Sequence, residues 1–471
     1  MKMKNRVRII QTFWSGGASP LVKSCGWTHP EYNLMSWALS CCSLREHYDQ
    51  VELYTDQRGY EVLIDKLHLP YTDVHVVYDD SLCLPQHWAY AKIKTYSMQT
   101  EPFLHVDGDI YISRPFEEDV LEAGLVVQNE EIGTAYYRNM LDAILRIPGV
   151  WLPDYVRSVL GDELLPSYNM GVFGGSDLRF IHDYCDEAKR FLEKNRLNDS
   201  GNPCSRVDCN VFFEQMLFAI YAKTVGKDIA RVIKRAVADN GYTRRDFCDV
   251  AKFHEKGFFH ILGGHKRVKN IYRRVADVLL AFYPDYYHRA VDIAGALPFA
   301  FVLRRGVLYD EFLSERIREW ETLDKKLLAD TEEATAKGLL TFFASNNDGE
   351  DSRVSLPPGF SLFSVALSSE EEKKYLRRHF KCEKNFPLDR IAVSPSLLYP
   401  GFNEFPLIEE DEQIASCLRR NGGTMSVREL QDEAIARRCC KDREAKLRVR
   451  DYVLEEITYM VKARILIAQE R

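Results

Sequence analysis

Runs of β-branched and aromatic residues alternate with helical segments through the first 290 residues, and no other feature of the sequence constrains the fold as strongly. Four such runs predict buried strands, at 7–13, 51–55, 74–77 and 103–106. Helices are predicted between them at 30–48 and 86–99, the first opened by a capping box of Thr28 and Glu31 around Pro30. This alternation favours a mostly parallel sheet with helices on both faces, so the predicted fold class is α/β.

The alternation stops near residue 290. We therefore expect a first domain over residues 1–290, a helical connector over 291–345 and a smaller, mostly helical domain over 346–471. The connector should contain a charged helix at 312–337, and the polar segment 346–352 is typical of a linker. Helices predicted at 411–420, 426–438 and 442–467 leave two interpretations of the last domain open. One is a winged-helix-like fold, and the other is a module that binds a partner or an acceptor.

Composition narrows the class of partner. Lys and Arg number 63 and Asp and Glu 70, and the net charge of −7 argues against a whole-chain basic surface for nucleic acid or anionic lipid. No segment has the roughly 20 apolar residues that a membrane helix needs. The basic first ten residues lack the apolar stretch of a secretory signal. The 12 cysteines form no Cys-x-x-Cys pair, so we expect reduced thiols in a cytoplasmic protein.

Two carboxylates one residue apart follow the strand predicted at 103–106. Asp107 and Asp109 can bind one hard divalent cation, and Gly108 lets the backbone turn so that both carboxylates converge. Apolar residues lie on both sides of the pair, which a solvated turn does not require. The alternative is an acidic β-turn between two strands. A bound cation would neutralise a diphosphate leaving group.

A second polar group lies late in the first domain. His260 ends a short apolar strand and can offer an imidazole to the same cation. Gly263 allows a close approach of the backbone to phosphate, and Lys266 offers a point charge. The alternative is a hydrogen-bonded core histidine, and His254 and His265 are close enough in sequence to take the role instead.

Further polar residues lie inside apolar segments or at strand ends, where open α/β sheets bind ligands. Asn169 enters a strand of small residues with Gly171, and the Glu214-Gln215 pair interrupts an apolar segment. Lys92 lies on the helix that leads to the Asp-Gly-Asp strand. Tight strand packing, an exposed helix face and a solvated lysine are the respective alternatives. The ends of the first two strands add Gln11, Thr12, Trp14 and Asp56.

In their order, these motifs resemble those of the nucleotide-sugar-dependent glycosyltransferases of the GT-A fold, of which the retaining glycosyltransferase family 8 is the nearest comparison. The shared motifs are an Asp-x-Asp after a strand, an Asn-x-Gly strand, an acidic-Gln pair and a late His-x-x-Gly-x-x-Lys. The segments SWALS, ELYTD, WAYAKIKTY and HVDGDIYISRPF look still more like a group of uncharacterised bacterial proteins allied to these enzymes. The resemblance covers residues 7–285 and not the C-terminal part.

The resemblance implies a GT-A-like mixed sheet flanked by helices. It also implies transfer of a sugar from a nucleotide-diphosphate sugar, with UDP the first choice, to a glycan, peptide or small-molecule acceptor. Mn²⁺ or Mg²⁺ would be held by Asp107, Asp109 and His260. The remaining implied roles are phosphate contact for Lys266, Lys92 and Gly263, nucleoside contact for Gln11, Thr12, Trp14 and Asp56, and the sugar pocket for Asn169, Gly171, Glu214 and Gln215. A retaining enzyme can use the leaving phosphate to accept the acceptor proton, whereas in an inverting enzyme Glu214 would be the base.

Two other functions stay open on the sequence. One is a non-catalytic protein of this fold that binds a glycan or a peptide. The other is a nucleotidyltransferase, which usually needs a Gly-rich phosphate loop containing Lys or Arg after the first strand. Residues 15–19 are rich in Gly and Ser, but the nearest lysine is Lys23. Metal-dependent donor hydrolysis would separate the transferase from the binding protein.

Overall fold

The chain forms two compact units, Met1–Val275 and Ala276–Arg471. The division falls inside helix α10 (Lys269–Phe282), and each unit is described by itself. In this computed structural model the residues described are 7–132, 135–162, 165–238, 241–243, 247–294, 307–344, 352–364, 370–381, 388–398 and 400–469. Within these ranges, no helix combines the length and the apolar character needed to cross a membrane.

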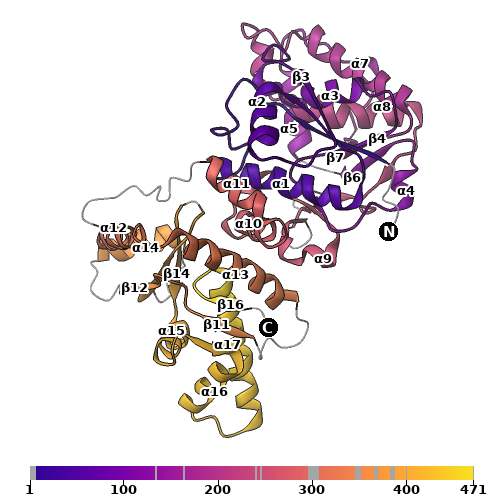
Figure 1. The fold of residues 1–471 in the computed structure, drawn as a ribbon. Coiled ribbons are helices and arrows are strands. Elements are labelled where there is room, and N and C mark those ends of the chain that lie inside the picture. Colours follow the sequence, from indigo (N-terminus) through magenta and orange to yellow (C-terminus); the bar gives the residue numbers. More distant parts are fainter. Residues whose placement is uncertain are drawn as a thin grey trace. The chain divides into compact units, whose positions relative to one another are not determined.

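A mixed eight-stranded sheet forms the centre of the first unit (Figure 1). Its strands are β1 (Arg8–Phe13), β2 (Val51–Asp56), β3 (Asp73–Tyr78), β4 (Phe103–Val106), β6 (Val126–Ile132), β7 (Ser167–Gly175), β8 (Ala230–Arg231) and β9 (Val237–Ala238). The strand order is β3-β2-β1-β4-β7-β6-β8, and β9 also pairs with β6. β3, β2, β1 and β4 are parallel, whereas β7 runs antiparallel to β4 and β6. The α/β class is confirmed. The sheet is mostly parallel, as the alternation predicted, and it is mixed, as the resemblance implied, because β7 runs antiparallel to β4 and β6 while the other strand pairs are parallel.

The two faces of this sheet are covered by different helices. Ile10 and Phe103 contribute to a core with α3 (Tyr90–Ser97), α7 (Leu178–Lys194) and α8 (Leu217–Val225). Their neighbours Ile9 and Leu104 point the other way and pack against α1 (Pro30–His47). In Figure 1, α1 lies on one side of the strands and the other three helices lie on the opposite side. Burial on both faces explains the consecutive apolar residues Ile9-Ile10 in β1 and Phe103-Leu104 in β4.

Helix α1 begins one residue later than the predicted capping box. His29 has an extended backbone, with φ −145° and ψ 150°, and its Nδ1 accepts a hydrogen bond from the Glu31 N–H at 3.4 Å. Pro30 takes the first helical position, where its missing N–H costs nothing. The helix predicted at 86–99 is a short 3₁₀ turn, η2 (Pro85–His87), followed by α3.

Short elements complete the first unit. Strand β5 (Ile110–Ile112) pairs with β10 (Phe258–His260) outside the main sheet. The remaining helices and helical turns are α2 (Gln57–Tyr60), η1 (Glu61–Lys66), α4 (Glu118–Leu121), α5 (Ala135–Leu145), α6 (Asp154–Arg157), η3 (Pro203–Arg206), η4 (Phe212–Met216), η6 (Val250–Lys252), α9 (Phe253–Lys256) and η7 (Gly263–Arg267).

The second unit contains helices and two three-stranded antiparallel sheets. The sheets have the orders β15-β11-β16 and β12-β13-β14, from β11 (Arg353–Ser355), β12 (Ser361–Ser364), β13 (Arg390–Pro395), β14 (Phe402–Leu407), β15 (Thr424–Ser426) and β16 (Ile467–Gln469). Its helices are α11 (Pro284–Ala294), α12 (Leu308–Trp320), α13 (Lys325–Ala344), α14 (Glu370–Phe380), α15 (Glu409–Arg420), α16 (Val427–Arg437) and α17 (Arg443–Lys462). The last three lie at the predicted helix positions, but the strands were not predicted.

The charged helix expected at 312–337 is in fact two helices. α12 ends at Trp320, and α13 begins at Lys325 after Asp324, whose side chain accepts a hydrogen bond from the Lys326 N–H at 2.9 Å. A side-chain cap of this kind starts a new helix and interrupts the old one. Most of the predicted linker, residues 346–351, lies outside the described residues.

Candidate metal centre

The Asp-Gly-Asp segment forms the turn between β4 and β5. The Asp107 N–H donates to the Gly171 carbonyl at 2.8 Å, and the Ile110 N–H donates to the Asp107 carbonyl at 3.1 Å. A Cβ on Gly108 would lie 2.4 Å from the indole of Trp37, so only glycine fits here. The turn therefore keeps its two carboxylates in place through backbone hydrogen bonds and close packing.

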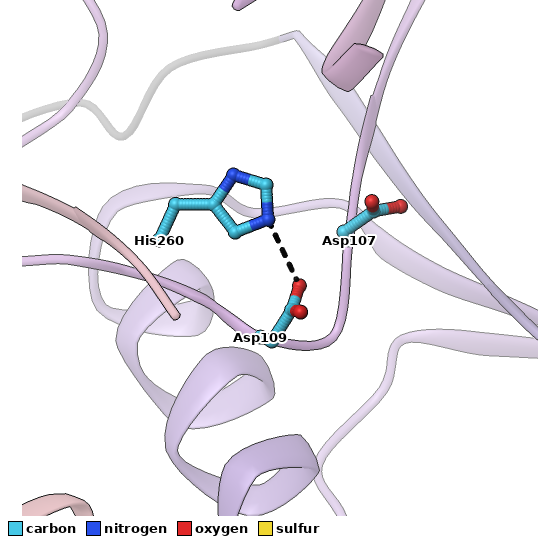
Figure 2. Close-up of side chains that lie close together, drawn as sticks. All are labelled: Asp107, Asp109 and His260. Carbon is cyan, nitrogen blue, oxygen red and sulfur yellow. Dashed lines mark ion pairs between the residues drawn. The ribbon is translucent and has the colours of Figure 1, made fainter. Parts of the chain in front are cut away.

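Pairing of β10 with β5 brings His260 to these carboxylates. His260 lies opposite Ile110 in the ladder, and the Ile261 N–H donates to the Asp109 carbonyl at 3.0 Å. His260 Nε2 is 3.4 Å from Asp109 Oδ1, and Figure 2 shows the imidazole directed at that carboxylate with Asp107 nearby. One ligand atom from each of the three residues lies within 4.8 Å of the others. The predicted meeting of Asp107, Asp109 and His260 is thus confirmed in space. His265 instead contacts the Tyr242 carbonyl through Nε2, at 2.9 Å.

Gln128 on β6 holds the other side of the imidazole. Its Oε1 lies 2.6 Å from His260 Nδ1, and Gln128 is fully buried. If Nδ1 donates this hydrogen bond, the lone pair of Nε2 is left facing Asp109, which suits a metal ligand. A Cβ on Gly171 would lie 2.5 Å from the imidazole and 2.6 Å from Gln128 Oε1, so this glycine makes room for the pair. Gln128 is a positioning residue that the sequence analysis missed.

Gln128→Leu is expected to weaken Mn²⁺ binding by about 10–100-fold, because His260 would lose the acceptor that orients its ring. Isothermal titration calorimetry on the full-length protein measures this affinity. Gln128→Glu retains an acceptor at the same place and serves as the matched control, with affinity expected close to wild type. Equal Mn²⁺ affinities for a folded leucine variant and the wild type would show that Gln128 does not orient His260.

Two lysines lie against the carboxylates. Lys92 Nζ is 2.7 Å from Asp107 and 2.8 Å from Glu214, and Lys266 Nζ is 2.7 Å from Asp109. Burial raises the pKa of Asp107 and of Glu214, with Lys92 opposing the shift at both. At Asp109 burial also acts to raise the pKa, but the charges of Lys266 and His260 outweigh it and hold the pKa well below its ordinary value. The site thus combines carboxylate groups that can bind a cation with ammonium groups that can contact phosphate.

A pocket of about 380 Å³ opens beside the carboxylates at the ends of β1 and β4. Six of the predicted site residues line it: Thr12, Trp14, Lys92, Asp107, Asp109 and Lys266. Four of the chain's six tryptophans also line it, namely Trp14, Trp27, Trp37 and Trp88, together with Lys23 and Cys25. The aromatic lining, apart from Trp14, was not predicted, although the tryptophans lie beside motifs that the sequence analysis had singled out.

Gln11 and Asp56 do not line this pocket. The Gln11 amide donates to the Ser40 hydroxyl and the Val106 carbonyl, and its oxygen accepts from Tyr71. Asp56 accepts from the Ser15 N–H at 2.9 Å and caps α2 through the Gly59 N–H at 2.8 Å. Both side chains therefore stabilise the fold around the pocket.

Two of the four predicted sugar-pocket residues, Asn169 and Gln215, lie near a carboxylate that was not predicted, Glu131 on β6, which Gln215 reaches through Tyr137. Asn169 Nδ2 donates to Glu131 at 3.5 Å, and the Tyr137 hydroxyl bonds to both Glu131 and Gln215. Glu214 is not part of this group, because it pairs with Lys92. A carboxylate inside the largely buried β6 was the available signal for Glu131.

Gly263 begins η7 with a φ of +43°, and among the described residues no side chain or backbone beyond its own segment lies within 4 Å of the place where its Cβ would be. Its neighbourhood is therefore open, as close approach by a ligand requires.

One family model matches residues 7–293, that of a family of unknown function, DUF6734. The match covers more than half of the chain and places it in this family. The search of curated proteins found no match for this chain.

Proposed function

We propose that this chain, which belongs to the family of unknown function DUF6734, is a metal-dependent glycosyltransferase that takes a sugar from a nucleotide-diphosphate sugar. The observation that carries the proposal is the cluster of Asp107, Asp109 and His260 beside a pocket of about 380 Å³ that also contains Lys92 and Lys266. Ligands at the ends of sheet strands are common in open α/β folds, which supports this placement.

The donor atoms suit the cation that the proposal requires. The two carboxylates suit both Mg²⁺ and Mn²⁺, and the imidazole favours a transition-metal ion, so we propose Mn²⁺ before Mg²⁺. A bound cation would supply positive charge to the donor diphosphate. Lys266 and Lys92 would add ammonium charge where the leaving phosphate gains negative charge. We propose UDP as the nucleotide on the resemblance described above.

Asn169, Gln215 and Glu131 would hold the transferred sugar, since their amide and carboxylate groups are gathered in one hydrogen-bonded group with Tyr137. Glu214 is 1% exposed and pairs with Lys92, which favours a role in holding that lysine over a role as base. This arrangement supports a retaining reaction, in which the leaving phosphate accepts the proton of the acceptor.

The proposal is tested with purified full-length protein, Mn²⁺ and a panel of UDP- and GDP-sugars. We expect Mn²⁺-dependent release of the nucleoside diphosphate from at least one donor, and binding of that nucleotide by calorimetry. Chelation of the metal should abolish the release. Absence of both hydrolysis and nucleotide binding would refute the proposal, and binding without hydrolysis would favour the non-catalytic alternative.

A further inference from the structure

Trp88 differs from the other tryptophans of the pocket in its exposure to water. Trp27 is 3% exposed and Trp37 8%, whereas Trp88 is 48% exposed although it lines the same pocket. The exposed part of an indole contributes no burial free energy to folding. Burying it against a ligand would contribute about 25 cal/mol per Å². The exposed face is therefore available to a bound molecule.

The backbone on both sides of Trp88 is held firmly. Asn210, which is 4% exposed, accepts a hydrogen bond from the Ala89 N–H at 3.0 Å and donates to the Gln86 carbonyl at 2.7 Å. His87, directly before the tryptophan, is fully buried. The indole is thus a large apolar surface on a fixed support, so little conformational entropy is lost when a ligand lies against it.

Lys92 is close to both the Trp88 indole and the candidate metal ligand Asp107. It follows Trp88 by four residues, and its Nζ lies 5.7 Å from the centroid of the indole and 2.7 Å from Asp107. On its buried side the same ammonium contacts Glu214, which is 1% exposed. Glu214, Lys92 and Trp88 therefore lead from the interior of the site to its solvent-facing edge.

We propose that Trp88 is the stacking platform for the acceptor, and that the acceptor is a carbohydrate whose apolar ring face lies on the indole. This inference rests on the proposed glycosyl transfer and names the acceptor class. A pyranose presents a flat face of C–H groups that matches an aromatic ring, and its hydroxyls remain free to face the reaction centre. The site of transfer lies next to the diphosphate, so an acceptor ring must approach Lys92 closely from the solvent side. A nucleobase, separated from the β-phosphate by ribose and a further phosphate, fits this short spacing less well.

The test uses full-length protein, Mn²⁺ and the donor that the wild type hydrolyses fastest, with methyl α- and β-glucosides and galactosides as acceptor probes. Trp88→Ala should raise the KM for the preferred glycoside about tenfold while the affinity for UDP is kept. Trp88→Tyr retains an aromatic face, so its KM for the preferred glycoside should stay close to that of the wild type. Tyr459→Ala removes an aromatic side chain of similar exposure, 46%, in the second unit and is the control.

Three results would overturn the inference: an unchanged acceptor KM in Trp88→Ala, a loss of UDP affinity in that variant, or no transfer to any glycoside by a wild type that hydrolyses donor. Saturation-transfer NMR with the same glycosides gives a readout without turnover. The wild type could bind a glycoside that Trp88→Ala does not bind, and yet show no nucleotide binding and no donor hydrolysis. That result would support sugar stacking on Trp88 and refute the proposed transferase.

Discussion

Asp109→Ala is expected to abolish detectable Mn²⁺ binding and to lower donor hydrolysis by about 10²–10³-fold. Asp109 is the carboxylate nearest His260, at 3.4 Å, and it belongs to the one three-residue cluster suited to a metal that the described chain contains. The pKa of this carboxyl is held well below its ordinary value by Lys266 and His260, which outweigh its burial, so it is an anion at neutral pH. Calorimetry with Mn²⁺ and a nucleotide-release assay measure the two losses.

The fold should tolerate this change. Lys266 loses its partner, but its side chain is 17% exposed and its ammonium can turn to water. We therefore expect a circular dichroism spectrum and a thermal midpoint close to wild type. Asp183→Ala removes an exposed aspartate on α7 and should leave both metal binding and hydrolysis intact. Turnover by Asp109→Ala at the wild-type rate would refute its role as a ligand.

Lys92→Met is expected to destabilise the first unit by about 3 kcal/mol, since it leaves two carboxylates without their shared counter-charge. Lys92 contacts Asp107 and Glu214 at 2.7 and 2.8 Å, and the Glu214 side chain is 1% exposed. Methionine fills similar space without a charge. Urea unfolding followed by tryptophan fluorescence measures the loss, with Lys94→Met, at an exposed position of the same helix, as the matched control.

The loss should depend on pH in a defined direction. Burial already raises the pKa of Asp107 and Glu214, and removal of Lys92 raises both further. The folded variant therefore binds protons that its unfolded chain releases. Its loss of unfolding free energy relative to wild type is then smallest near pH 5 and grows toward about pH 8. Added Mn²⁺ should restore more stability to this variant than to the wild type, because the cation replaces the missing charge at Asp107. A deficit that shrinks as the pH rises would contradict this account.

Local patterns in the chain identified the parts of the site but not their surroundings. The strand before Asp107 is recognisable from its apolar run, and Gly108 between two aspartates marks a turn. Gln128 was not recognisable, because its role depends on β6 lying beside the imidazole of a residue far along the chain. The structural roles of Gln11 and Asp56 were equally hidden, since their partners Ser40, Tyr71 and Ser15 come from distant parts of the chain.

The amino-acid sequence by itself determined strands β1 to β4, helices α1 and α3, the position of the Asp-Gly-Asp turn and the three helices near the C-terminus. These depend on side-chain periodicity and turn chemistry, which act between near neighbours. Only the tertiary structure decided the reversed direction of β7, the short strands of the second unit and the β10–β5 register that brings His260 to Asp109. Those features come from pairing between distant segments, where three-residue strands carry no periodic signal and gain their stability from the partner strand.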